Sequence, residues 1–169
     1  MNWLLNRLRG WLAGKRASLS CSEAIWLAGA KELARRTRNR RQESGAFLLG
    51  TEGYPRRIEK FVFYDDLDPH ALNSGYVHFD GSKFPLLWKL CREQGLTVVA
   101  DVHVHPGGFQ QSHSDRTEPA IPRAGHIALI LPDFAHKNIR PGGIGMYEYL
   151  GNQQWTDRTS EGTAFFQLD

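Results

Sequence analysis

Residues 97–106 read Thr97-Val98-Val99-Ala100-Asp101-Val102-His103-Val104-His105-Pro106. The first half of this stretch is apolar and rich in β-branched valine, which predicts a buried strand. Alternate side chains of a strand share a face, so we expect His103 and His105 to point the same way from one rigid element. The following Pro106-Gly107-Gly108 ends the strand and turns the chain, which lets a loop return Asp115 to that face.

These three residues, the metal triad (His103, His105 and Asp115), have the composition of a catalytic zinc site. Two imidazoles and one carboxylate supply three protein ligands and leave the fourth tetrahedral position to water. A structural zinc site is more often closed by cysteines. The two cysteines of this chain, Cys21 and Cys91, lie far apart in the sequence and near no histidine. The alternative is that His-x-His is only a surface feature of an edge strand.

An upstream carboxylate bears on this choice. Glu43 begins the segment Glu43-Ser44-Gly45-Ala46-Phe47-Leu48-Leu49-Gly50, in which small residues lead into a short apolar strand. Alone, it would be interpreted as a solvated carboxylate at the start of a strand. Combined with residues 103–106 and with Ser112-His113-Ser114-Asp115, it resembles the signature of the JAB/JAMM (MPN-type) zinc metalloproteases, over roughly residues 20 to 150.

The sequence departs from this family pattern at one place. The loop between His105 and Asp115 is one residue shorter than is usual for the family, although the Ser-x-x-Asp spacing is kept. We therefore keep Asp115 as the expected ligand. His113 lies in the same loop and is the competing candidate.

The resemblance implies a role for each motif residue. One zinc ion would be held by the metal triad, and Glu43 would act as the general base that takes a proton from water and passes it to the departing nitrogen. Ser112 would donate a hydrogen bond to the developing oxyanion; without the resemblance, a turn or helix cap explains this serine equally well. By its position alone, Asp101 is a candidate to orient a ligand imidazole, although its side chain should share the ligands' face and could equally face solvent.

The resemblance also implies a substrate class. Members of the family hydrolyse isopeptide or peptide bonds after the C-terminal glycines of ubiquitin and ubiquitin-like proteins. The segments 77–80, 101–107 and 125–130 look like a bacterial branch that is encoded beside ubiquitin-like, E1-like and E2-like proteins in antiviral-defence operons. The alternatives are an inactive MPN-type binding scaffold, which typically lacks the metal ligands, and a metallohydrolase of the same family that acts on another small amide.

The expected fold is α/β. A chain of 169 residues with 41% hydrophobic content is sized for a single domain. A capping box at Ser20-Cys21-Ser22-Glu23 predicts a helix to about Arg36, and a second helix is expected at residues 83–95. Strands are expected at residues 46–50, 58–64, 126–131 and 144–150. This order predicts a mixed central sheet flanked by helices, and the resemblance implies a sheet of the cytidine-deaminase-like type, with residues 20–169 as the metalloprotease domain.

The distribution of charge and the cysteine content bear on the kind of partner and on the compartment. The formal net charge is +3, and much of the positive charge is local, in Arg35, Arg36, Arg38, Arg40 and Arg41. This run lacks interleaved aromatic residues, which favours a solvated helix end or a surface for an acidic partner over nucleic-acid binding. Two cysteines give no disulfide framework and indicate a reducing cytoplasm.

Residues 1–19 form a separate extension in this interpretation. Tryptophans and leucines recur at near-helical spacing in residues 1–14, with basic residues on or beyond the other face. The apolar run is too short and too interrupted to span a membrane, and the segment is a poor signal peptide. It is expected either to pack on its own domain or dock on a partner, or to lie in a membrane interface. The first of these is favoured.

Overall fold

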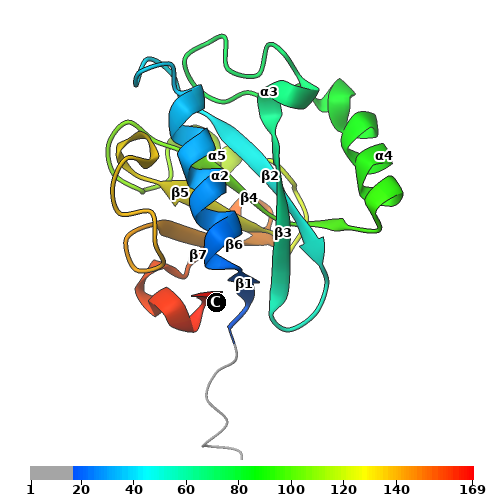
Figure 1. Cartoon of the computed structure of the whole chain (residues 1–169), viewed down its shortest axis with the longest axis vertical. Helices are drawn as coiled ribbons and strands as arrows, with labels where there is room; N and C mark the ends of the chain where they lie inside the picture. The colour runs from blue at the N-terminus through cyan, green and yellow to red at the C-terminus, as the bar shows by residue number, and fades with distance from the viewer. Residues whose placement is uncertain (1–16) are drawn as a thin grey trace, which may run out of the picture.

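Eight strands pair into one mixed sheet in the computed structural model, which describes residues 17–169 (Figure 1). Their order in the sheet is β7-β6-β5-β4-β2-β3-β1-β8. The strands are β1 (Leu19–Cys21), β2 (Gly45–Thr51), β3 (Arg56–Phe63), β4 (Thr97–Val104), β5 (Ile127–Leu131), β6 (Gly145–Gly151), β7 (Gln154–Asp157) and β8 (Phe166–Leu168). With the helices that flank this sheet, the predicted α/β class is confirmed.

The predicted histidine strand, β4, lies inside the sheet. It pairs antiparallel with β2 and parallel with β5, and all of its residues after Thr97 are buried. A strand that is covered on both faces and both edges reads as a continuous apolar run, which explains the Val-rich sequence. The position of β4 therefore fixes the histidines that follow its apolar part.

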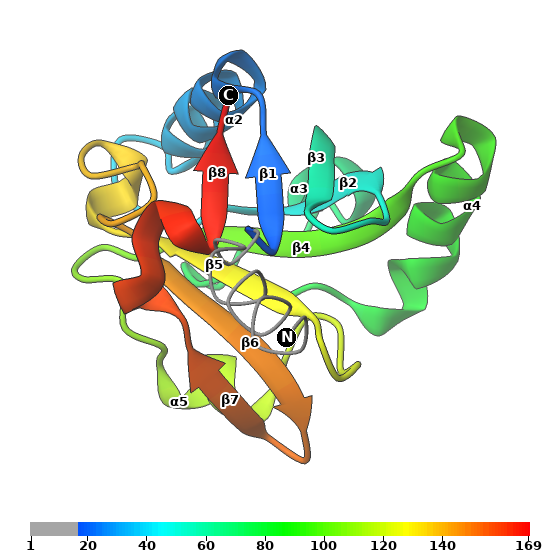
Figure 2. The same cartoon turned by 90° about the horizontal axis from the view of Figure 1, so that it is seen from below.

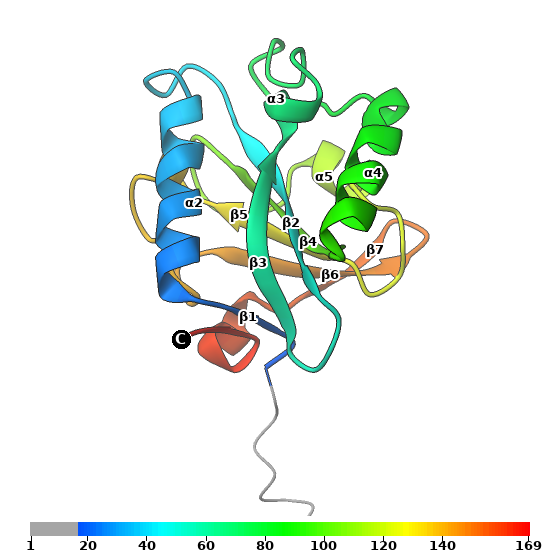
Figure 3. The same cartoon turned by 45° about the vertical axis from the view of Figure 1, so that its right-hand side comes forward.

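Alternation along β2 and β4 divides the core into two layers. Ala46, Leu48, Val102 and Val104 belong to the cluster that packs on α2 (Glu23–Arg36). Phe47 and Leu49 belong to the cluster that packs on α4 (Phe84–Gln94). Because neighbouring residues of a strand point to opposite faces, the two helices cover opposite faces of the sheet, as Figure 3 shows. Asp101 and His103, which alternate with the valines, face the α4 side.

Both long helices begin and end near the predicted places, but the predicted first cap is wrong. Ser22, and not Ser20, is the N-cap of α2, where its side chain accepts a hydrogen bond from the Ile25 N–H at 3.2 Å. Ser20 is unavailable because residues 19–21 form β1, which pairs with β3 and β8. At the end of α4, Gly95 adopts the left-handed conformation (φ 64°) that favours glycine as a cap.

The shorter elements were not expected from the sequence. They are the helices α3 (Tyr64–Leu67) and α5 (His113–Thr117), the 3-10 turns η1 (Gly81–Lys83), η2 (Asp133–Ala135) and η3 (Thr159–Ala164), and the strands β1, β7 and β8. Figure 2 shows β8 beside β1, which places the C-terminal end of the chain against its first described strand. Such short segments carry too little periodicity to be recognised.

The amphipathic helix predicted for residues 1–14 lies outside the described residues. The predicted extension was given residues 1–19, but Leu19 is the first residue of β1 and is fully buried, so the sheet includes it. Among residues 17–169, no helix is both long enough and apolar enough to cross a membrane.

Candidate metal centre

The end of β4 positions both histidines. His103 lies opposite Gly45 of β2 and Ile130 of β5, so its backbone is held on both sides. His105 follows the last residue of the strand, but its N–H still donates to the Leu131 carbonyl at 2.9 Å. The strand geometry therefore continues through both residues, and their side chains share a face.

A short helix brings the carboxylate to them. Ser112 is the N-cap of α5, and Asp115 is its third residue. The Asp115 N–H donates to the Ser112 hydroxyl at 3.2 Å, and the Ser112 N–H donates to Asp115 Oδ2 at 2.6 Å. This reciprocal capping box fixes the start of α5 and orients the carboxylate. The helix-cap interpretation of Ser112 is thus what the structure describes, and the hydroxyl accepts there without needing to donate.

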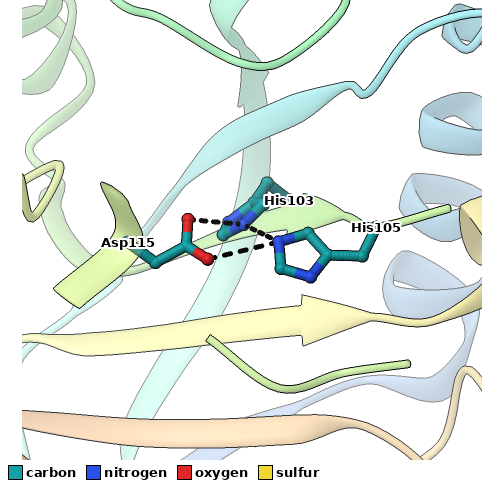
Figure 4. A group of neighbouring side chains, drawn as sticks. All are labelled: His103, His105 and Asp115. Carbon is teal, nitrogen blue, oxygen red and sulfur yellow. Dashed lines mark hydrogen bonds and ion pairs between the residues drawn. The ribbon is translucent and has the colours of Figure 1, made fainter. Parts of the chain in front are cut away.

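The ligand atoms of the metal triad have the spacing of a metal site (Figure 4). The two Nε2 atoms are 2.9 Å apart, and they lie 3.2 Å and 3.3 Å from the two Asp115 oxygens. A tetrahedral ion with bonds of about 2.0–2.1 Å places its ligand atoms roughly 3.3 Å from one another. All three residues can offer an atom to one point, and the group could hold a metal ion.

Asp115 and His103 each shift the pKa of the other. Burial is the strongest single influence on His103, only 8% exposed, and it lowers the imidazole pKa. The hydrogen bond and charge of Asp115, together with the charges of Asp101 and Glu43, outweigh it, so the pKa is raised. Burial likewise raises the pKa of Asp115, but hydrogen bonds from His103 and His105 outweigh this influence and leave the pKa well below its usual range. A permanently ionised carboxylate next to two imidazoles is a suitable set of donors for a divalent cation.

Glu43 lines the same cavity as the metal triad. It comes two residues before β2, where its N–H donates to the Gly75 carbonyl at 2.8 Å and its Oε2 accepts from the Val77 N–H at 3.4 Å. Its charge is one of those that raise the His103 pKa, which places it within electrostatic reach of the site. Ser112 lines the cavity as well. The structure therefore gathers all five of the residues singled out from the motif.

His113, the competing ligand candidate, is not among the residues that converge at the candidate site. It is the first residue of α5 and is exposed, and it does not line the cavity. The metal-binding group found among residues 17–169 contains Asp115 and omits His113.

The cavity itself has a volume of about 490 Å³, and much of its wall is aromatic. Sequence reasoning missed this wall, which comes from α3 (Tyr64), the loop before η1 (Tyr76 and Phe79), the start of α4 (Phe84) and β7 (Trp155). The Trp155 Nε1–H donates to the Arg116 carbonyl at 3.1 Å, which joins β7 to α5. No local pattern marks such residues, because they meet only after the sheet has formed.

Asp101 was a candidate either to orient a ligand imidazole or to face solvent, and the structure buries it with other partners. It is 3% exposed, accepts from the Tyr64 hydroxyl at 3.1 Å, and lies 2.6 Å from Nε2 of His126. Both carboxylate oxygens are thereby used in a buried network beneath the metal triad. His126 is 2% exposed and is the third histidine of this region with a carboxylate partner, after His103 and His105.

This network predicts a graded loss of stability. Asp101→Ala leaves the Tyr64 hydroxyl and His126 without their partner in a buried place, which is expected to lower the free energy of unfolding by about 2–4 kcal/mol. Tyr64→Phe removes one donor and keeps the Asp101–His126 pair, so its effect is expected to be about 1–2 kcal/mol. Urea unfolding of the two variants measures both; equal losses would contradict the network.

Metal affinity is expected to fall with acid. Because the His103 pKa is raised in the metal-free chain, protons begin to compete for its imidazole above the ordinary histidine value of about 6.5. Asp115 stays ionised over this range, since its pKa is lowered. Affinity for zinc, titrated against a fluorescent chelator from pH 8 to pH 5, should drop by about tenfold or more per pH unit in the lower half. A flat profile would contradict imidazole ligation.

Comparison with known proteins supports the fold alone. No family model matches the chain. The solution structure of a protein from Desulfitobacterium hafniense is similar, with a TM-score of 0.65 at 15% sequence identity over 89% of this chain and 92% of that chain. A solution structure from Salinibacter ruber has a TM-score of 0.52 at 17% identity over 82% of this chain and 88% of that one. These likenesses agree with a single α/β domain built on a mixed sheet.

Proposed function

We propose that this chain is a zinc-dependent peptidase or isopeptidase of the JAB/JAMM (MPN-type) kind, which cleaves after the C-terminal glycine of a ubiquitin-like protein. The observation that carries the proposal is the metal triad, whose ligand atoms are 2.9–3.3 Å apart within a cavity that also holds Glu43. Two nitrogen donors and one carboxylate suit zinc with an open coordination position. When bound there, zinc supplies a water of lowered pKa and polarises the scissile carbonyl.

Glu43 is the proton-transfer group in this proposal. An amide has a poor leaving group, so its hydrolysis needs a base that accepts a proton from water and an acid that returns it to the nitrogen. Glu43 lines the cavity and is half-buried, and its backbone N–H donates to the Gly75 carbonyl. In this proposal the Glu43 carboxylate carries the proton from the water to the departing nitrogen, while the backbone at Glu43 stays in place.

Ser112 has the geometry for a supporting role. Its hydroxyl oxygen accepts from the Asp115 N–H, and in the described part of the chain no protein acceptor takes the hydroxyl hydrogen. That hydrogen can point into the cavity, toward an oxyanion that develops on the substrate carbonyl. Capping and oxyanion binding are compatible, because one uses the lone pair and the other uses the proton.

The glycine-ended substrate follows from the resemblance and from sterics. A residue without a side chain lets the backbone of the substrate approach the metal triad between the aromatic walls of the cavity.

The two free cysteines, Cys21 and Cys91, are both buried and suit the proposed reducing cytoplasm. Partners of the E1-like and E2-like kinds, encoded in the same antiviral-defence operon, belong to the same proposal.

The experiment is cleavage of a fusion placed after the last glycine of the ubiquitin-like protein encoded beside this gene. We expect cleavage by the zinc-loaded protein, loss of cleavage with a chelator, and slowing by at least about tenfold when the penultimate glycine becomes leucine. Hydrolysis of unrelated small amides without cleavage of any glycine-ended fusion would favour a general metallohydrolase. Binding of the ubiquitin-like protein without cleavage would favour an inactive scaffold.

A further inference from the structure

A second cavity, of about 610 Å³, lies between α2 and η2. It shares no lining residue with the cavity of the metal triad. The less exposed lining residues form an apolar floor: Leu27, Ala34, Ala135 and Ile139. The exposed ones form a basic rim: Lys31, Arg35, Arg40 and His136. The rim residues are exposed, and the floor residues are buried or half-buried. The cavity therefore offers an apolar pocket surrounded by positive charge.

No residue that lines this cavity carries a carboxylate. Arg35 pairs with Glu32 at 2.6 Å, and Arg40 pairs with Asp133 at 3.5 Å, but both arginine side chains remain about half exposed or more. The Arg40 pair is long and exposed, and such a pair contributes little to stability, whereas Arg35 is held to Glu32 by two hydrogen bonds of 2.6 Å and 2.7 Å. The Arg40 guanidinium can therefore turn toward an incoming carboxylate at small cost, and Arg35 can use the N–H donors that Glu32 leaves free.

The structure divides the arginine run into two kinds of residue. Arg36 is structural: it pairs with Asp65 and Asp66 at 2.7 Å each and lies 4.1 Å from the centre of the Phe63 ring, which ties the end of α2 to α3. Arg35 and Arg40, in contrast, line the cavity. Arg41 belongs to the run but neither lines the cavity nor is buried, which makes it a matched control.

The loops that wall the cavity hold unfavourable backbone conformations. Three consecutive residues in each loop have φ between 49° and 63°, namely Arg38, Asn39 and Arg40 in one and Asp133, Phe134 and Ala135 in the other. Left-handed conformations in non-glycine residues are costly and collect at binding sites. The Phe134 N–H also donates to the carbonyl of His105 at 2.8 Å, so this loop is hydrogen-bonded directly to a residue of the metal triad.

We propose that this second cavity docks an acidic peptide segment of a partner protein. One aliphatic side chain of the segment would occupy the apolar floor, and carboxylates on either side would meet Lys31, Arg35 and Arg40. Guanidinium forks match carboxylates in geometry as well as in charge. Nucleic acid fits less well, because no phenylalanine, tyrosine or tryptophan lines the cavity for a base to stack on.

The test uses the full chain and a fluorescein-labelled peptide in which one leucine is flanked by glutamates. We expect saturable binding by anisotropy, which Lys31→Glu weakens by at least about tenfold. Arg41→Glu, a matched charge reversal outside the cavity, should change the affinity by less than about twofold. Replacing the peptide leucine with serine should weaken binding by about tenfold, because the floor is then left unfilled.

Several results would overturn the proposal. These are the absence of saturable binding, equal effects of Lys31→Glu and Arg41→Glu, or equal binding of the leucine and serine peptides. Tighter binding of a single-stranded oligonucleotide of the same charge, with the same dependence on Lys31, would assign the cavity to phosphates instead. Arg40→Gln gives a second measurement that does not depend on the tolerance of α2 for a new glutamate, and it should also weaken the peptide.

Discussion

Glu43→Gln is expected to reduce cleavage by at least about a hundredfold while the protein keeps its metal and its fold. Glutamine preserves the size of the side chain and can still accept a hydrogen bond from the Val77 N–H, which Glu43 accepts at 3.4 Å. It cannot take a proton from water and return it to a leaving nitrogen. Single-turnover cleavage of the glycine-ended fusion, with zinc content measured on the same sample, separates the two properties.

Glu52→Gln is the matched control. Glu52 follows β2, as Glu43 precedes it, but its side chain is 60% exposed and lies outside the cavity. This variant should cleave at the rate of the unchanged protein. Activity of Glu43→Gln within a few-fold of that rate would remove Glu43 from the mechanism and leave the metal triad without its proposed base.

Asp115→Ala is expected to weaken metal binding by more than about a hundredfold and to abolish cleavage. Loss of an outer-shell partner alone typically costs 10–100-fold in metal affinity, and Asp115 is placed as a direct ligand. The substitution also removes the carboxylate half of the α5 capping box. The metal measurement therefore needs a variant that disturbs the cap alone.

Ser112→Ala is that variant. It removes the hydroxyl that caps α5 at a cost of about 1 kcal/mol, but it leaves all three ligand atoms in place. We expect it to keep its metal and to lose cleavage by about a hundredfold or more, because the oxyanion donor is gone. If Ser112→Ala lost metal as completely as Asp115→Ala, the carboxylate would act through the helix cap and not as a ligand.

The sequence predicted the elements whose patterns are strong and local. The valine-rich run of β4, the apolar run of β5 and the helix expected at residues 83–95, which is α4, were each predicted from local patterns, and their bounds agree with the structure to within a few residues. The convergence of His103 and His105 also follows from one strand with a period of two. The turn at Pro106-Gly107-Gly108 allows Asp115 to return to that face, but the choice of Asp115 over His113 depended on the family resemblance, since a loop has no such period.

What could not be predicted depends on contacts between distant segments. The three residues of β1 form a strand only because β3 and β8 flank them, and Ser20 was misjudged as a cap for that reason. Asp101 lies on the same face of β4 as His103, but its two carboxylate oxygens interact with Tyr64 and His126 and not with a ligand imidazole. The second cavity likewise needs α2 and η2 side by side, although they are separated by half of the chain.

Zinc content combined with X-ray absorption at the zinc edge tests the central claim most directly. We expect close to one zinc per chain, surrounded by two imidazole nitrogens and by oxygen donors at about 2.0–2.1 Å, with no sulfur. Cys21 and Cys91 are both buried and neither belongs to the metal-binding group, so sulfur ligation would place the metal elsewhere. A spectrum with sulfur ligands, or a protein that stays metal-free in excess zinc at neutral pH, would contradict the account.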